Sequence, residues 1–250
     1  MGKLGGIGYD ELEEFWVQLE TSLRTLGSLQ EVAQVFANAL YERFEESVVL
    51  VRVFATAEVR QLHPRERAFV DDFCAQNSVS HQLDDATDVL SLLGSRGVED
   101  EWNDRRGSKG HLAVPLISEQ FIGEIPMLAG LLTEIGFRPA WGHARSNFVV
   151  TSLANVNGIF YVDDAKTGRD ERGRSVIPAA EFVERYGVRT VFGFGGSYLS
   201  GHTFISTIVF CRDHVRRSDA TKFVPMIGSL KALTTRLVRR GAIFASDPTI

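Results

Sequence analysis

The chain has 250 residues, of which 44% are hydrophobic and 24% are charged, an ordinary composition for a soluble globular protein. Its net charge of −5 argues against nonspecific nucleic-acid binding, and the basic residues near its end read as a solvated helix face. No apolar stretch approaches the roughly 20 residues that span a bilayer, and the N-terminus has no signal-peptide pattern. We therefore expect a cytoplasmic protein with neither a membrane nor a nucleic-acid partner.

The two cysteines lie far apart in the sequence, each inside an apolar run. Neither Cys74 nor Cys211 has a neighbouring Cys or His at metal-ligand spacing. We expect two free thiols that act as small core residues in a reducing compartment.

The first third of the chain predicts two helices and a strand. Residues 1–8 are rich in glycine, which predicts a loose start. Apolar residues recur every three or four positions over 9–26, which indicates a helix. Ser28 and Glu31 form a capping-box pattern that opens a second helix reaching Phe44. The β-branched run 47–54 then predicts a buried strand.

The middle of the chain predicts three further helices and a strand. Pro64 opens a helix over 64–76, and a shorter helix over 86–93 ends at Gly94. The polar segment 95–110 reads as a loop, and 111–118 as a strand. Pro126 opens an apolar helix over 126–135 that Gly136 stops.

The last part of the chain predicts four strands and two helices. Strands over 148–153 and 158–162 are joined by a short turn that contains Asn157 and Gly158. The charged segment 163–175 reads as exposed, and a helix over 178–186 ends at Gly187. Over 190–237 the pattern is strand, polar connection, strand, turn and amphipathic helix.

Strands this close together favour a mostly antiparallel or mixed sheet, so the fold class is α/β of the α+β type. The simpler interpretation is one domain with an enlarged middle, and the alternative is two domains divided near 137–143. The predicted parts are a helix over 1–27 that is a candidate dimerisation element, a domain over 28–240 with insertions around 56–147 and 163–187, and a tail over 241–250.

Two segments resemble the GAF superfamily of sensory domains. They are SLQEVAQVFANALYERFEESVVLVRVF and VFGFGGSYLSGHTFISTIVFCRDHVRRSDATKFVPMIGSLKAL, which together cover under half of the chain. The segment EWNDRRGSKGHLAVPL is also similar to uncharacterised GAF-like input modules of bacterial signalling proteins. The resemblance implies an antiparallel sheet of five or six strands with flanking helices and a small-molecule pocket formed by the connecting segments.

Members of this superfamily often dimerise through their first and last helices, so the resemblance also implies a homodimer and a signalling-protein partner. The apolar stripes from Leu12 to Leu26 and from Phe223 to Leu237 have the spacing for such a contact. The alternative is that both stripes pack on the sheet of their own chain.

The chemical subtypes of the superfamily do not match this sequence. A bilin-binding domain needs a Cys that is often followed by His, but Ala75 follows Cys74 and Arg212 follows Cys211. The redox cysteines of the methionine sulfoxide reductase type and the motif of cyclic-nucleotide types are also missing. The cofactor and the ligand are therefore unknown.

Two further motifs are weak. Gly193, Gly195 and Gly196 suggest a phosphate loop, but they lack its spacing and its lysine, so we interpret them as turn or bulge residues. The histidines show no metal-ligand spacing, and no metal site is expected. They are His63, His81, His111, His143, His202 and His214.

The best ligand-site candidate is the loop before the strand at 111–118. It combines an aromatic ring, two guanidinium groups, a hydroxyl and an imidazole, which can bind a carboxylate or phosphate and stack a ring. These residues are Trp102, Arg105, Arg106, Ser108 and His111. In the alternative interpretation Trp102 anchors the loop and the arginines pair with nearby acids, namely Glu99, Asp100, Glu101 and Asp104. Weaker candidates flank strand ends: Tyr161, Asp163, Arg174 and Tyr198.

Three functions remain open from the sequence. The first is a non-enzymatic GAF-like protein that senses or binds a small molecule in bacterial signal transduction, with no catalytic residue. The second is an enzyme with His111 or His202 as a general base. The third is a pure protein-interaction module.

Overall fold

The structure is a computed structural model that describes residues 2–108, 110–136, 157–199 and 203–246. Its helices are α1 (Tyr9–Leu23), α2 (Leu29–Arg43), α3 (Pro64–Gln76), α4 (Glu119–Gly123), α5 (Pro126–Ile135), α6 (Ala180–Arg185), α7 (Arg217–Thr221) and α8 (Val224–Arg239). Its strands are β1 (Val48–Glu58), β2 (Asp88–Gly97), β3 (Ala113–Pro115), β4 (Asn157–Val162), β5 (Thr190–Ser197) and β6 (Phe204–Cys211).

The strands form one six-stranded sheet in the order β3-β2-β1-β6-β5-β4, and each neighbouring pair is antiparallel. The longest pairing joins β1 to β2, and β6 lies on the other side of β1. The predicted fold class, an antiparallel sheet with flanking helices, is confirmed.

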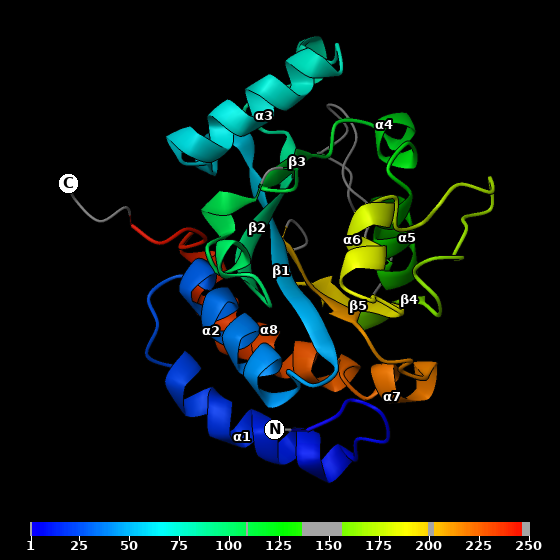
Figure 1. Ribbon diagram of the computed structural model, residues 1–250. Coiled ribbons are helices and arrows are strands. Elements are labelled where there is room, and N and C mark those ends of the chain that lie inside the picture. Colours follow the sequence, from blue (N-terminus) through cyan, green and yellow to red (C-terminus); the bar gives the residue numbers. More distant parts are fainter. Residues whose placement is uncertain (1, 109, 137–156, 200–202, 247–250) are drawn as a thin grey trace.

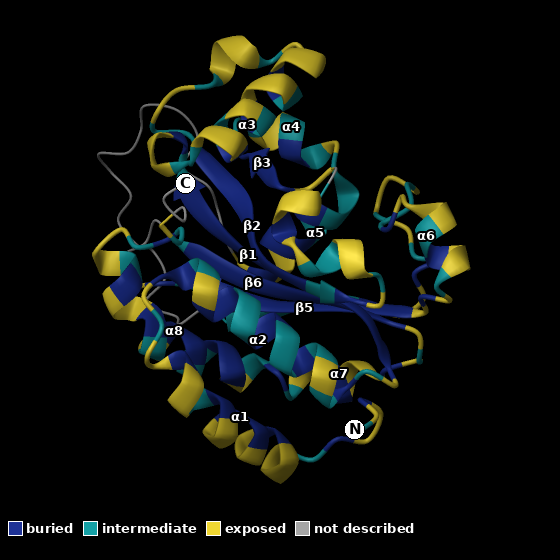
Figure 2. Ribbon diagram, turned by 60° about the vertical axis from the view of Figure 1, so that its left-hand side comes forward, coloured by how far each residue is buried: buried dark blue, intermediate teal, exposed yellow. Residues whose placement is uncertain are grey.

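Helices cover both faces of the sheet (Figure 1). Figure 2 shows the buried strands between a layer that contains α1, α2 and α8 and a second layer that contains α5. Side chains of β1 alternate between the two layers: Val51 and Val53 belong to the core under α2, whereas Leu50 and Phe54 belong to the core under α5 and α6. This alternation follows from the two-residue period of a strand.

The predicted apolar stripes of the first and last helices pack within their own chain. Leu12, Phe15 and Leu19 of α1 are buried in the core that also holds Ile227 and Leu230 of α8. This agrees with the alternative in which each stripe packs on its own chain. In the described part of the chain, no helix combines the length and the apolar character needed to cross a membrane.

The start of the chain is not loose, which corrects the prediction for residues 1–8. Leu4 and Ile7 are buried, at 1% and 3% exposure. The amide of Leu4 donates to Ser47 Oγ at 3.1 Å, and the amide of Gly6 donates to the buried carboxylate of Asp219 at 3.3 Å. Glycine content alone does not report such anchoring, because the partners lie far away in the sequence.

The predicted helix over 86–93 is wrong, because these residues lead into and form strand β2. Val89, Leu90, Leu92 and Leu93 are buried on both faces of the sheet, between β1 and β3. A strand buried on both faces shows a continuous apolar run, which periodicity cannot distinguish from a short buried helix. The predicted loop over 95–110 accordingly begins later, after Gly97.

Two predictions about glycines are also wrong. Asn157 and Gly158 form no turn but lie in β4, paired with Gly196 and Gly195 of β5. Gly193, Gly195 and Gly196 form neither a turn nor a bulge, because they lie in the regular β5–β6 ladder.

These glycines allow close approach of neighbouring chain segments. A Cβ atom on Gly158 would lie 2.6 Å from the Cα of Ile135 in α5. On Gly195 it would lie 2.5 Å from the carbonyl oxygen of Ile205.

The other predicted elements agree with the structure, including the capping box of α2, in which the amide of Glu31 donates to Ser28 Oγ at 3.2 Å. Cys74 and Cys211 are free and buried, as expected for core residues. The predicted strand over 148–153, the alternative domain boundary near 137–143, and His202 lie outside the described residues.

Candidate ligand pocket

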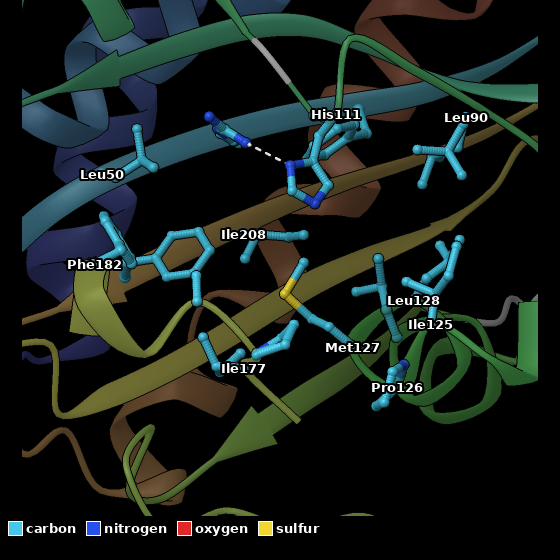
Figure 3. A pocket seen from close by; sticks show the side chains of 18 of the residues that line it. Leu50, Leu90, His111, Ile125, Pro126, Met127, Leu128, Ile177, Phe182 and Ile208 are labelled. Carbon is cyan, nitrogen blue, oxygen red and sulfur yellow. Dashed lines mark hydrogen bonds between the residues drawn. The ribbon is translucent and has the colours of Figure 1, made fainter. Parts of the chain in front are cut away.

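A cavity of about 410 Å³ lies on the face of the sheet that α5 and α6 cover. Figure 3 shows its lining from close by. Strands β1, β2, β3 and β6 form its floor, and α5, α6 and the segment before β3 form its walls. A volume of this size accommodates a small organic molecule.

Most of the lining is aliphatic or aromatic. Met127 extends into the middle of the cavity between Ile208 of β6 and Ile177 (Figure 3). Leu128 and Leu131 come from the same helix as Met127, and Phe182 comes from α6. Pro126 is the first residue of α5, a position where its fixed φ suits the start of a helix.

Arg52 is the single side chain with a permanent charge among the lining residues that the structure describes. The two-residue period of β1 places it on the cavity face, between Leu50 and Phe54. Its Nε is inaccessible to solvent and has no hydrogen-bond partner in the part of the chain that the structure describes. Burial lowers the pKa of Arg52 to about 10, so the guanidinium still carries its charge near pH 7.

Among the described residues, His111 is the one side chain that forms a hydrogen bond with Arg52. Arg52 Nη1 lies 3.5 Å from His111 Nδ1 (dashed line in Figure 3). Because arginine has only donors, Nδ1 of His111 accepts, which leaves the proton of the neutral ring on Nε2. No carboxylate in the described residues forms an ion pair with Arg52, and its pKa shift has no carboxylate contribution.

His111 lies at the mouth of the cavity and is exposed as a residue, while its ring is directed toward Arg52 and the apolar lining. Desolvation of the ring and the adjacent Arg52 charge lower the pKa of His111 from 6.5 to about 4. Near pH 7 the ring is therefore neutral. The cavity then carries one positive charge and no negative one in its described lining.

Trp102 also lines the cavity, but its ring is held by protein contacts. It lies edge-on to Tyr186 and Phe182, with ring centroids 4.8 and 5.6 Å apart. Gly97 leaves room for the indole, because a Cβ atom there would lie 2.7 Å from Trp102 Cε3. Trp102 thus anchors its loop and closes one side of the cavity at the same time.

Arg105 and Arg106 do not line the cavity, because both are engaged elsewhere. Arg105 is buried in an ion pair with Glu66 of α3, with Nη2 2.6 Å from the carboxylate oxygen, and it also donates to the carbonyl of Leu92. Arg106 is exposed and pairs with Asp104 at 2.8 Å. The alternative interpretation of this loop is correct for Arg106, whereas Arg105 pairs with a distant residue instead of a nearby acid.

The remaining predicted site residues lie apart from the cavity. Ser108 lies in the same loop but does not line it. Arg174 pairs with Asp170 at 2.8 Å and, together with Tyr161 and Asp163, lines a second and more polar hollow beside β4.

The hydroxyl of Tyr161 lies 2.7 Å from the carbonyl oxygen of Val215, and Asp163 lies 3.0 Å from His214 Nε2. Tyr198 is buried against α8, with its hydroxyl 2.7 Å from Thr234 Oγ1. The structure therefore brings only Trp102 and His111 of the nine predicted residues into the apolar cavity.

Sequence reasoning missed Arg52 and the cavity side of α5. A signal for Arg52 was present, since it is the lone charge in the strand VVLVRVFATAE apart from the final glutamate. A charge inside a buried strand is costly unless something compensates it, so such a residue is a candidate for function. In the described residues, no group of three His, Cys, Asp or Glu side chains is arranged to hold a metal ion.

No family model matches the chain, and no curated protein sequence matches it. Solved structures do. The GAF domain of the Acinetobacter phosphoenolpyruvate-protein phosphotransferase is 14% identical, with a TM-score of 0.48, and the match covers 96% of this chain and 100% of that one. The GAF domain of the corresponding Coxiella burnetii protein is 12% identical, with a TM-score of 0.49 and coverage of 95% and 100%.

A phycoerythrobilin-bound GAF domain from a cyanobacterial phytochrome is 10% identical, with a TM-score of 0.46 and coverage of 94% and 98%. Likeness of this size says nothing about ligand or activity. Each of these three solved structures is a GAF domain.

Proposed function

We propose that this protein is a non-enzymatic small-molecule-binding or sensory module, GAF-like as its sequence resemblance implies, whose ligand occupies the cavity beneath α5 and α6. The observation that carries the proposal is the cavity itself, with a volume of about 410 Å³ and a predominantly apolar lining. Cavities with this lining and a few polar groups are the usual form of small-molecule sites.

Binding is favoured over catalysis by the composition of the lining. A histidine general base acts on a proton of a positioned substrate and works best with a pKa near the operating pH. His111 has its pKa lowered to about 4, and no lining residue of the described cavity carries a carboxylate, hydroxyl or thiol. We find no observation that favours the enzyme alternative.

The signal would pass through β1. Leu50, Arg52 and Phe54 line the cavity, whereas Val51 and Val53 between them pack under α2. A ligand that displaces the cavity-lining side chains of β1 therefore also shifts the side chains that pack under α2. Through α2 the shift reaches α1 and α8. This route needs a ligand with different affinity for two packing arrangements.

A bacterial signalling-protein partner, a homodimer through the outer faces of the terminal helices and a cytoplasmic location remain parts of the proposal. The outer face of α1 offers Val17 and Tyr9, which are 60% and 61% exposed. A pure interaction module is the competing function, and it predicts no saturable binding in the cavity.

The test uses the neutral fluorescent probe N-phenyl-1-naphthylamine. We expect saturable binding of one probe per chain, and we expect Met127→Trp to abolish it by filling the cavity. Val17→Trp, which adds the same side chain on the exposed face of α1, serves as the matched control and should leave binding unchanged. Absence of saturable binding, or equal binding by the Met127→Trp variant, would overturn the proposal.

A further inference from the structure

The cavity pairs an apolar lining with a cation for which the described residues supply no anionic partner. Its walls are aliphatic and aromatic, yet Arg52 projects from the middle of its floor. Two other arginines of this fold show the contrast, because each pairs with a carboxylate. Arg105 meets the carboxylate of Glu66 at 2.6 Å, and Arg174 meets that of Asp170 at 2.8 Å.

A guanidinium in an apolar environment costs free energy unless an anion and hydrogen-bond acceptors compensate it. His111 supplies one long hydrogen bond at 3.5 Å and no negative charge. The Nε of Arg52 has no hydrogen-bond partner among the described residues. Arg52 thus keeps donors that the described residues do not satisfy.

We propose that the ligand is an amphipathic anion, with an apolar body against α5 and α6 and one terminal anionic group, such as a carboxylate, on the Arg52 guanidinium. This inference rests on the proposed function, since it names the ligand class of the same cavity. The planar fork of arginine matches a carboxylate in a bidentate pair. The neutral ring of His111, with its proton on Nε2, offers a further donor at the mouth.

The geometry also orients the ligand. Arg52 comes from β1 and His111 from the segment before β3, whereas Met127 and Leu131 come from α5 on the opposite wall. The anionic end therefore lies against the sheet near His111, and the apolar end lies against α5. A ligand without the charge would fill the same volume and leave Arg52 uncompensated.

A matched pair of probes tests the inference. The neutral probe N-phenyl-1-naphthylamine and 8-anilino-1-naphthalenesulfonate share one aromatic body and differ by a sulfonate. We expect the wild-type protein to bind the sulfonate more tightly, and Arg52→Met to weaken only the sulfonate, by about 10- to 100-fold in Kd. Arg52→Lys should retain part of the preference, because it keeps the charge but not the fork.

Arg96→Met is the matched control. Arg96 lies on neighbouring strand β2, and its Nε is likewise buried and unpartnered, but its guanidinium stacks on Tyr41 of α2, 5.6 Å from the ring centroid, on the other face of the sheet. The Arg96→Met variant should change the affinity for neither probe. Arg52→Met removes a half-buried charge without a carboxylate partner among the described residues, so we expect its thermal stability without ligand to equal or exceed that of the wild type. Saturation at one probe per chain and unchanged near-ultraviolet circular dichroism distinguish site binding from loosened packing.

Competition between the sulfonate probe and simple carboxylates or alcohols completes the test. Decanoate and 2-naphthoate should each displace the sulfonate probe from the wild-type protein, and their relative potency distinguishes an aliphatic from an aromatic body. Decanol and 2-naphthol should displace it more weakly. If both probes bind equally and Arg52→Met changes neither, the amphipathic-anion inference is wrong while the proposed function stands. If neither probe binds saturably, the proposed function itself fails.

Discussion

Two residues determine the chemistry of the cavity, and the sequence analysis names only one of them as a site candidate. His111 stands out because it follows a polar loop and begins an apolar run, a position that often borders a site. Arg52 is hidden inside a run of β-branched residues, where the period of the strand, and not its composition, decides which face it occupies. The partner of Arg105, Glu66, lies 39 positions away and could not be inferred from local sequence.

The lowered pKa of His111 predicts a pH dependence of stability. In the unfolded chain His111 takes up a proton as the pH falls through 6.5, whereas in the folded chain it does so only near 4. The unfolded state then binds more protons between these values, so His111 destabilises the fold as the pH falls from 6.5 to about 4 and has no further effect below. Arg52 is the other titratable group of the lining, and it stays protonated throughout this range.

The measurement is urea unfolding of the wild type and His111→Asn across this pH range. Asparagine keeps an acceptor for Arg52 but does not titrate. We expect the free energy of unfolding to fall less steeply with decreasing pH in the variant, with the two curves diverging below pH 6.5. Parallel curves over the whole range would contradict the prediction, since carboxylate titrations are common to both proteins.

At the scale of elements, the sequence predicts best where the pattern is long and least where a segment is short and buried on all sides. The helices α1, α2, α3, α5 and α8 follow from apolar periodicity and their capping or proline signals. The sequence predicts a helix where strand β2 lies, because the apolar run is short and continuous. It also predicts Gly94 as the end of that helix, whereas Gly94 allows the close contact between β2 and α2.

This contact makes Gly94 sensitive to substitution. A Cβ atom at Gly94 would lie 2.4 Å from the carbonyl oxygen of Ala33, which belongs to the backbone of α2 and cannot yield as a flexible side chain would. We expect Gly94→Ala to lower the free energy of unfolding by about 1–3 kcal/mol, as overpacking of a core does. Chemical denaturation measures the change.

Gly123→Ala provides the control for this substitution. Gly123 ends α4, and nothing lies within 4 Å of the Cβ atom that alanine would add. The free energy of unfolding of Gly123→Ala should stay unchanged or rise by about 0.5 kcal/mol, because alanine loses less backbone freedom on folding than glycine does. Equal losses in both variants would show that close packing of α2 on β2 is not the cause.

At the scale of the whole molecule, the sheet separates a layer with a continuous core from a layer that encloses the cavity. The layer of α1, α2 and α8 forms a continuous core that includes both the start of the chain and Ile243 near its end. The opposite layer, with α5 and α6, encloses the cavity. The sequence predicted this architecture through its terminal segments, but the cavity arises from contacts between elements distant in the chain, and no local pattern reports such contacts.

The central claim, that a ligand enters the α5 and α6 face of the sheet, can be tested through the methionines. The chain has three, and two of them lie on opposite faces: Met127 in the cavity and Met226 in the core beneath α8. Nuclear magnetic resonance of the protein labelled with ¹³C in its methionine methyl groups reports on both at once. Upon saturation with N-phenyl-1-naphthylamine, we predict a large shift of the Met127 methyl signal and a smaller one at Met226, which lies at the far end of the route through β1 and α2; a shift of Met226 with Met127 unmoved would contradict the account.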